Sequence, residues 1–275
     1  MRMFALFLIL FSSVCFGEPI KVVVLDTGFK ANKNYTVPLC KGYHLDLTKE
    51  GAKPSDIAPL DENGHGTHVV GLINQFAQDL PLTSILPFKT NRNNLAKLNK
   101  AVPNGYCFVI VKYYSNNGKN AVNWAKGLKY IETIPGKLLI NLSGGGGERF
   151  KTETTYISKI LAKNNKVIAA IGNENNDKGY YPAYEPGVTA VGSIDITTYK
   201  KENVVPISEV FLKNKNIYVY KSNYSNYGVS KIVWRFGALY SGGLNDDIVY
   251  MRGTSQATAM ETGLVLKEML QNKEK

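Results

Sequence analysis

Runs of β-branched and apolar residues alternate with helical segments along most of this chain, and that alternation limits the folds available to it. The first run covers residues 20–25 and is typical of a strand buried on both faces of a parallel sheet. Further strands are expected at residues 40–45, 105–114, 137–142, 166–171, 188–191 and 232–234. Helices are expected from His65 onward and at residues 121–131, 152–164 and 256–270. We therefore predict an α/β fold of right-handed β-α-β units, with three α/β/α layers around a mostly parallel central sheet.

The composition fits a single globular domain. The chain has 275 residues, 44% of them hydrophobic and 20% charged, which is enough to bury a full core. Its formal net charge is +11. A basic protein can bind nucleic acid, but these lysines are scattered and form no arginine-rich tract or RNA-binding signature. We expect a solvated basic surface, no nucleic-acid partner and a monomer.

Residues 1–17 predict a signal peptide. Arg2 supplies the positive start, residues 3–11 are apolar without interruption, and residues 15–17 form an acceptable cleavage site. A membrane anchor is the alternative, but the apolar run is short for a span of about 20 residues. Lipid modification of Cys15 is disfavoured because the bulky Val14 precedes it.

Cleavage after residue 17 leaves residues 18–275 as one domain, which we expect to be secreted or periplasmic, with no stable membrane insertion. Export permits disulfides, and the mature chain keeps Cys40 and Cys107 in or beside strand-like runs. A bridge between these two cysteines and two separately buried thiols are both open at this stage.

Three polar residues stand at strand ends or helix starts beside small residues. Ser255 lies in the small-residue stretch 253–259, at the start of the last predicted helix, where free N–H groups and the positive dipole end favour a developing oxyanion. A serine hydroxyl needs an adjacent base to act as a nucleophile. Asp26 ends the first strand, at the edge where open α/β sheets place their sites. Each residue also has a structural interpretation, since serine often caps helices and aspartate often stands in turns.

His65 is the candidate base. His65 and His68 are two of three histidines in the chain and lie at a helix start. A metal site is disfavoured, because His-x-x-His supplies only two ligands and no other Cys, His or Glu is spaced to complete it. A general base with clearance from flanking glycines fits this pattern better.

A glycine-rich loop at residues 143–147 follows the strand at 137–142 and is expected to expose backbone N–H and C=O groups to a ligand. Phosphate binding is disfavoured because no Gly-Lys-Ser/Thr follows the loop. The flanking strand and helix argue against a flexible linker.

Six segments together resemble the subtilisin-like serine protease family, in places its proteinase K branch. In chain order they read DTG at 26–28, NGHGTHVVG at 63–71, NLSGG at 141–145, AAIGN at 169–173, YYPAYEP at 180–186 and GTSQA at 253–257. The order Asp, His, Ser is that of subtilisin. The resemblance covers about residues 20–270 and implies a subtilisin-like fold and a serine endopeptidase.

The resemblance also implies roles for individual residues. Ser255 would attack the peptide carbonyl, His65 would be the general base, and Asp26 would orient the imidazole. Asn173 would contribute to the oxyanion hole. Protein or peptide substrates would add as a strand beside the substrate-binding residues. These are Ser115, Asn116, Asn117, Ser143, Gly144, Gly145, Gly172, Glu174 and Tyr180. In the family's sheet the strands carrying Cys40 and Cys107 are neighbours, which favours the disulfide.

Several positions depart from the family pattern. Asp26 follows closely after residue 17, so no prodomain is expected. The proteinase K calcium site would use carbonyls at Pro186 and Val188, but its carboxylate is missing from residues 231–234, so no cofactor is expected and calcium is doubtful. The usual methionine after the serine is Gln256, and the usual proline in the following helix is Ala259. These departures suggest a divergent, compact member.

Two other functions stay open. The chain could be a secreted binding protein on an inactive subtilisin-like scaffold, although all the expected catalytic residues are present. It could also be a serine esterase, although the nucleophile lacks the Gly-x-Ser-x-Gly pattern.

Overall fold

The computed structural model describes residues 18–33, 36–78, 105–114, 120–202, 206–212 and 215–273. The predicted signal peptide, residues 79–104, and the predicted substrate-binding residues Ser115, Asn116 and Asn117 lie outside these ranges.

A nine-stranded, mostly parallel sheet forms the centre of the described chain, as predicted. Its main path runs β2-β3-β1-β4-β5-β6-β8-β7, and β9 pairs with β6 off this path. Six parallel pairings join β1, β2, β3, β4, β5, β6 and β9, whereas β8 is antiparallel to β6 and to β7. The strands are β1 Ile20–Asp26, β2 Leu45–Asp46, β3 Tyr106–Lys112, β4 Leu138–Leu142, β5 Lys166–Ala170, β6 Thr189–Thr197, β7 Ser208–Leu212, β8 Lys215–Lys221 and β9 Ile232–Phe236.

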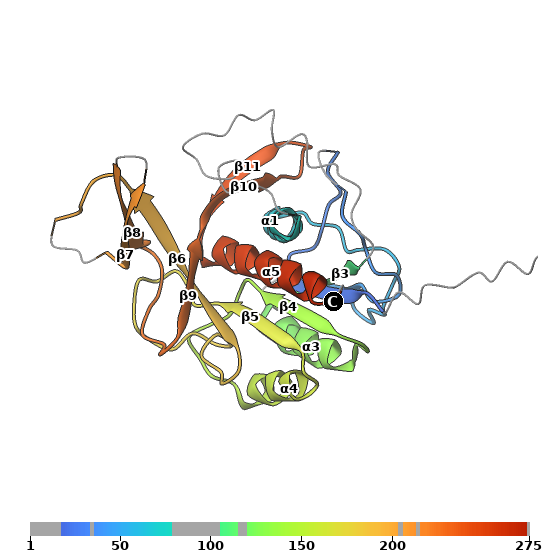
Figure 1. Cartoon of the computed structure of the whole chain (residues 1–275). Helices are drawn as coiled ribbons and strands as arrows, with labels where there is room; N and C mark the ends of the chain where they lie inside the picture. Colours follow the sequence, from blue (N-terminus) through green and yellow to red (C-terminus); the bar gives the residue numbers. More distant parts are fainter. Residues whose placement is uncertain are drawn as a thin grey trace, which may run out of the picture.

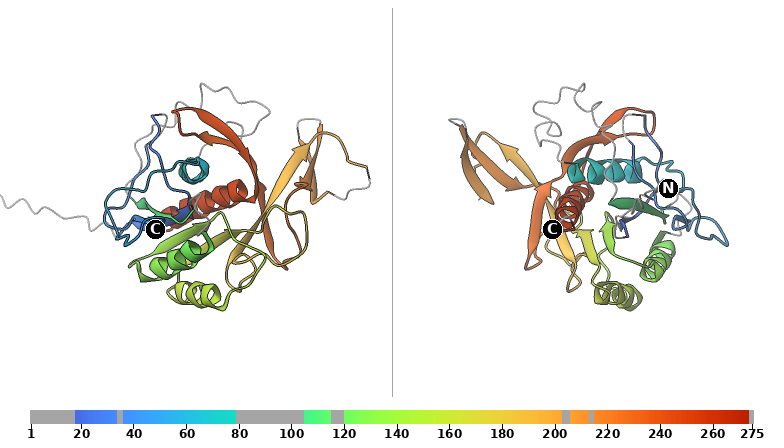
Figure 2. Two further views of the ribbon diagram at one scale, coloured as in Figure 1. Left: turned by 180° about the vertical axis from the view of Figure 1, so that it is seen from behind. Right: turned by 45° about the vertical axis from the view of Figure 1, so that its right-hand side comes forward.

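Helices cover both faces of this sheet, which gives the predicted three layers (Figure 1). α1, His65–Ala77, and α5, Thr254–Gln271, pack together on one face. α3, Asn120–Thr133, and α4, Lys151–Ala162, pack together on the other, as both views of Figure 2 show. Within the described ranges, no helix is both long and apolar enough to cross a bilayer.

Alternation along β1 explains why its sequence is apolar almost throughout. Val22 and Val24 lie in the core cluster under α1 and α5, whereas Val23 and Leu25 lie in the cluster under α3 and α4. Successive strand side chains point to opposite faces, so a strand covered on both sides needs apolar residues at consecutive positions.

The strand expected at residues 40–45 is wrong in extent. β2 is only two residues long, and Leu39 makes a separate bridge to Phe108 of β3. Between them Gly42 adopts a left-handed conformation, φ 80°, which turns the chain and interrupts the ladder.

The disulfide favoured by the family resemblance is present between Cys40 and Cys107, whose Cα atoms lie 5.1 Å apart. Two backbone hydrogen bonds beside it, from Cys40 N to Phe108 O (2.9 Å) and from Phe108 N to Pro38 O (2.7 Å), hold the same segment against β3. The bridge therefore fixes a segment that has little regular structure of its own.

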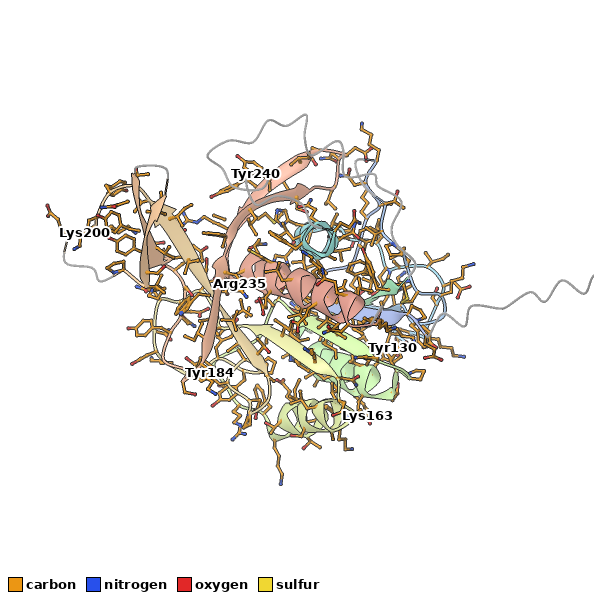
Figure 3. The ribbon with its side chains drawn as sticks, in the orientation of Figure 1. Tyr130, Lys163, Tyr184, Lys200, Arg235 and Tyr240 are labelled. Carbon is orange, nitrogen blue, oxygen red and sulfur yellow. A yellow bond between two sulfur atoms is a disulfide. The ribbon has the colours of Figure 1, made fainter. Side chains whose placement is uncertain are left out.

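Beyond β6 the chain differs more from the prediction. β6 runs to Thr197, well past the expected end at residue 191, and carries the antiparallel strands β7 and β8 on an arm that projects from the body (Figure 1). The described residues between 195 and 220 are therefore mostly strand. Figure 3 shows Lys200 far out on this arm and Arg235 beside α5. There Arg235 Nε donates to Glu261 Oε2 at 2.6 Å and links β9 to the helix.

A hairpin that the sequence analysis missed leads into the last helix. β10, Ala238–Gly242, and β11, Ile248–Arg252, pair antiparallel as a separate two-stranded sheet. The hairpin lies beside α1, where His68 Nε2 is 3.3 Å from Val249 O.

Candidate active site

Asp26 and His65 meet at the carboxyl end of β1. Asp26 is the last residue of β1 and is 3% exposed. Its Oδ1 lies 2.8 Å from His65 Nδ1 and accepts a hydrogen bond from Thr27 N at 2.7 Å. A carboxylate is acceptor-only, so Nδ1 of the neutral imidazole carries the proton and Nε2 is left as the free base.

Close backbone packing brings His65 to this position. Gly66 N donates to Thr27 Oγ1 at 2.8 Å, and a Cβ on Gly66 would come within 2.3 Å of Gly28 O. Glycine is therefore required after the histidine, because any side chain would push the start of α1 away from the end of β1.

The environment of His65 raises its pKa above the ordinary value of 6.5. Burial opposes the charged form, but the carboxylate of Asp26 and its hydrogen bond outweigh that cost, and Asp61 adds a smaller effect in the same direction. The imidazole side chain stays 28% exposed, so a substrate can reach it.

Asp61 is a site residue whose role the sequence analysis missed. It is 2% exposed and accepts hydrogen bonds from Thr27 Oγ1 (2.9 Å) and Thr67 Oγ1 (2.7 Å). It also accepts from the backbone N–H groups of Asn63, Gly64 and Thr67 at 2.8–2.9 Å. These contacts tie the end of β1 to the first turn of α1. The sequence feature that could have predicted this role is an aspartate a few residues before a helix start, because such a carboxylate often accepts hydrogen bonds from the free N–H groups there.

Ser255 lies in the first turn of α5, which begins at Thr254, two residues before the predicted helix start at residue 256. Its Oγ donates to Ser143 O at 2.8 Å, and Ser143 Oγ donates to Ser255 O at 3.0 Å. The Ser255 hydroxyl is thus directed at the end of β4, and among the described residues no hydrogen bond joins Ser255 Oγ to His65.

Asn173 follows β5 and faces the residue before the serine. Its Oδ1 accepts from Thr254 N at 2.8 Å and from Thr254 Oγ1 at 3.1 Å. An N–H can only donate, so the atom facing it is the amide oxygen, and the Nδ2 group remains as a donor for a ligand.

The remaining predicted substrate residues fall into two groups. Ser143, Gly144 and Gly145 follow β4 beside Ser255, whereas Gly172, Glu174 and Tyr180 lie on the segment that carries Asn173. Glu174 is exposed as a residue, but its Oε2 accepts from Asn226 Nδ2 at 2.6 Å and lies beside Gly172, where a Cβ would come within 2.5 Å of that oxygen.

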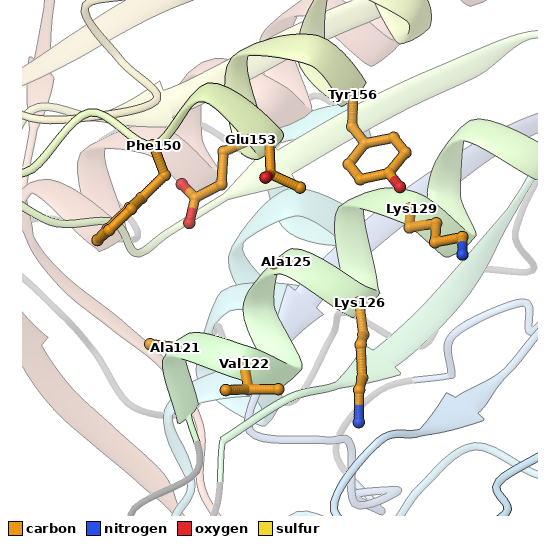
Figure 4. A pocket seen from close by; sticks show the side chains of 9 residues that line it. Ala121, Val122, Ala125, Lys126, Lys129, Phe150, Glu153 and Tyr156 are labelled. Carbon is orange, nitrogen blue, oxygen red and sulfur yellow. The ribbon is translucent and has the colours of Figure 1, made fainter.

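Two hollows lie beside α3, and the glycine-rich loop lines one of them. One, of about 310 Å³, is lined by Gly145 and Gly146 with aromatic side chains that include Tyr113, Trp124 and Phe150. The other, of about 410 Å³, lies between α3 and α4 with Phe150 at one end (Figure 4). Only the first is lined by a predicted site residue.

His68 is not placed to bind a metal. It is fully buried, and burial together with the nearby His65 lowers its pKa to about 3. In the ranges that the structure describes, no three His, Cys, Asp or Glu side chains are grouped so that they could hold an ion.

Comparison with known proteins supports one family. Residues 17–273 match the Peptidase_S8 subtilase family. The chain therefore belongs to the subtilases. It is 28% identical to subtilisin BL of Lederbergia lenta over 183 residues, which are 65% of this chain and 57% of that protein. It is 26% identical to thermitase of Thermoactinomyces vulgaris over 261 residues, which are 90% of this chain and 74% of that protein.

Solved structures support the same fold. Sphericase superposes with a TM-score of 0.65 at 19% identity, over 94% of this chain and 79% of that one. A cold adapted subtilisin-like serine proteinase superposes with a TM-score of 0.63 at 21% identity, over 92% of this chain and 76% of that one. The chain spans a smaller part of some curated relatives, such as 40% of the alkaline protease of Alkalihalobacillus alcalophilus.

Proposed function

We propose that this subtilase is a serine endopeptidase that uses Asp26, His65 and Ser255 and forms an acyl-enzyme. The observation that carries the proposal is the 2.8 Å contact between the buried Asp26 carboxylate and His65 Nδ1. It leaves Nε2 free to take a proton, and the raised pKa of His65 makes the imidazole a stronger base.

Substrate binding releases the nucleophile. The backbone N–H of the substrate residue before the scissile bond donates a hydrogen bond to Ser143 O. It thereby replaces the Ser255 hydroxyl, which donates to the same carbonyl oxygen in the free protein. The hydroxyl turns to His65, and Oγ attacks the substrate carbonyl carbon while its proton passes to Nε2. The oxyanion accepts hydrogen bonds from Asn173 Nδ2 and the Ser255 N–H. Such an asparagine contributes on the order of 3 kcal/mol in subtilisin.

The second half of the reaction returns the enzyme to its starting state. His65 gives its proton to the leaving nitrogen as the C–N bond breaks, and the acyl group stays on Ser255 Oγ. Water then loses a proton to His65 and attacks the ester carbonyl, the acid product leaves, and Oγ regains the proton. Asp26 stays ionised and stabilises the imidazolium in both halves.

Extended peptides add as a strand along Ser143–Gly145. The aromatic hollow beside Gly145 and Gly146 supplies apolar contact further from the scissile bond. Protein and peptide chains are therefore the proposed substrates.

The chain works without a metal in this proposal. β9 begins at Ile232, opposite Ala190, and residues 231–234, which would supply the carboxylate of a calcium site, carry none. Treatment with EDTA should leave kcat/KM and the melting temperature unchanged. A melting temperature that falls in EDTA and returns only with calcium would contradict this.

The chain is also proposed to be exported. Residues 1–17 support this, and the Cys40–Cys107 disulfide fits an oxidising compartment. N-terminal sequencing of protein from the culture medium or periplasm should begin at residue 18. Retention of the full chain in the cytoplasm would contradict export.

The test of the function is hydrolysis of a quenched fluorescent peptide by wild type and Ser255→Ala. The variant should fold and lose several orders of magnitude in kcat/KM. Equal turnover by both proteins would end the assignment. No turnover by the folded wild type would favour a binding protein on an inactive scaffold, and turnover of esters alone would favour an esterase.

A further inference from the structure

Tyr180 places its ring between the two backbone segments that flank the candidate nucleophile. A Cβ on Gly172 would lie 2.6 Å from Tyr180 Cδ2, and a Cβ on Gly145 would lie 2.9 Å from Tyr180 Cε1. The phenol also donates to Gly145 O at 3.2 Å. The ring thus lies against both glycines on facing segments. Asn226 Nδ2 and Glu174 Oε2 share the space at Gly172, and Tyr181 O lies closest to Gly145.

The backbone around Tyr180 is held in place. Gly146 and Tyr181 exchange two hydrogen bonds, from Gly146 N to Tyr181 O at 3.0 Å and from Tyr181 N to Gly146 O at 2.7 Å. Tyr184 N donates to Tyr180 O at 3.1 Å. Burial, with a smaller effect from Glu174, raises the pKa of Tyr180 to about 12, so the phenol keeps its proton and its bond to Gly145 near neutral pH.

The same space is where the side chain of the acylating residue must go. Its carbonyl carbon has to lie beside Ser255 Oγ, with the oxygen toward Asn173 Nδ2, and its N–H has to reach Ser143 O. These constraints fix the Cα between the segments 143–145 and 172–174. The side chain on that Cα then points into the gap that the Tyr180 ring occupies.

We propose that Tyr180 closes the pocket for the residue on the acyl side of the scissile bond, so that this protease cleaves after glycine or alanine and rejects larger residues. The inference rests on the proposed function and adds its substrate class. A ring fixed by its neighbours excludes a bulky side chain by overlap, and an excluded side chain lowers kcat/KM by misplacing the scissile carbonyl.

The experiment uses matched quenched peptides that differ only in the acyl residue, which is alanine, leucine or phenylalanine. Wild type should cleave the alanine peptide at least about 100-fold better in kcat/KM than the phenylalanine peptide. Tyr180→Gly should raise kcat/KM for the phenylalanine peptide by about 10-fold or more and remove the preference. Tyr180→Phe is the matched control, because it keeps the ring without the hydroxyl, and it should retain the preference for alanine.

The fraction of active protein is measured in each sample with a fluorophosphonate. This reagent reacts with the serine and has no side chain that would need the proposed pocket. Equal cleavage of the alanine and phenylalanine peptides by fully labelled wild type would overturn the inference and leave the proposed function intact. An unchanged preference in fully labelled Tyr180→Gly would also overturn it. Wild type that takes no label and cleaves no peptide would overturn the proposed function and the inference with it. If Tyr180→Gly does not fold, the cut sites that wild type makes in a denatured protein, read by mass spectrometry, decide between small and large acyl residues.

Discussion

At the scale of single residues, the candidate site residues could be predicted from the sequence, but the contacts between them could not. Asp26, His65, Ser255 and Asn173 could be singled out because each follows a strand or begins a helix beside small residues. The bond from Ser255 Oγ to Ser143 O could not be predicted, because it depends on how the start of α5 packs against the end of β4.

Gln256 carries a residue-scale prediction about oxidation. It is 2% exposed, and its Nε2 lies 4.0 Å from Met251 Sδ. A methionine at this position would bring an oxidisable thioether beside the nucleophile, and its sulfoxide would crowd the acyl intermediate. Gln256→Met should therefore lose activity several-fold faster than wild type in the same peroxide solution.

Met251 and Met260 are present in both of these proteins, so their oxidation affects both alike. Activity is followed against time, and peptide mapping reports which methionines have reacted. Equal loss rates in wild type and Gln256→Met would show that Gln256 gives no protection.

At the scale of elements, Asp61 joins β1 to α1. Burial opposes the charged form of Asp61, but hydrogen bonds from Gly64, Thr67 and Asn63 outweigh it and hold the pKa below the ordinary value. Asp61→Asn should destabilise the fold by about 3 kcal/mol at pH 7, because an amide cannot satisfy the same donors and introduces N–H groups of its own. The measurement is urea unfolding of both proteins, with the exposed-site variant Glu50→Gln as the control.

The pH dependence of this difference has a defined sign. A lowered pKa means that Asp61 stabilises the fold above the unfolded-state pKa, about 3.9, and that this contribution is lost as pH falls through the lower folded-state value. The gap between wild type and Asp61→Asn should therefore narrow below about pH 4. A gap that stays constant from pH 7 to pH 3 would show that the charge of Asp61 is not what stabilises the fold.

Elements also show how far the sequence could predict the fold. β1, β4 and β5 were predicted because burial on both faces leaves a run of apolar residues, as at Val22 to Leu25. The β10–β11 hairpin was missed because Tyr250 is exposed and Tyr240 is only partly buried, so the pattern is neither an apolar run nor a clear alternation. The strand expected at residues 40–45 is interrupted because Gly42 adopts a left-handed conformation and turns the chain, which the apolar pattern alone did not indicate.

At the scale of the whole molecule, the Cys40–Cys107 bridge joins positions 67 residues apart in sequence. Replacing both cysteines by serine should lower the free energy of unfolding by about 2–4 kcal/mol, because the unfolded chain loses a constraint. Activity per labelled serine should stay near that of wild type, since neither cysteine belongs to the candidate site. Unreduced, denatured protein that begins at residue 18 should show no free thiol, and two free thiols would contradict the bridge.

The whole fold brings four site residues together from separate elements, and one labelling reaction can test whether they activate Ser255. The sheet brings Asp26 and Asn173 to the site from the strand ends, and the two helices on its upper face present His65 and Ser255 at their first turns (Figure 1). If this assembly activates the serine, a fluorophosphonate should react at that residue alone, at a rate set by the protonation of His65.

The measurement is the rate of fluorophosphonate labelling between pH 5 and pH 9, with the modified residue identified by peptide mapping. We predict one adduct per chain, on Ser255, at a rate that falls as pH drops through an apparent pKa above 6.5, because only neutral His65 can accept the proton. His65→Ala should label at least about 1,000-fold more slowly. An adduct elsewhere, or a labelling rate at Ser255 that is unchanged in His65→Ala, would contradict the account.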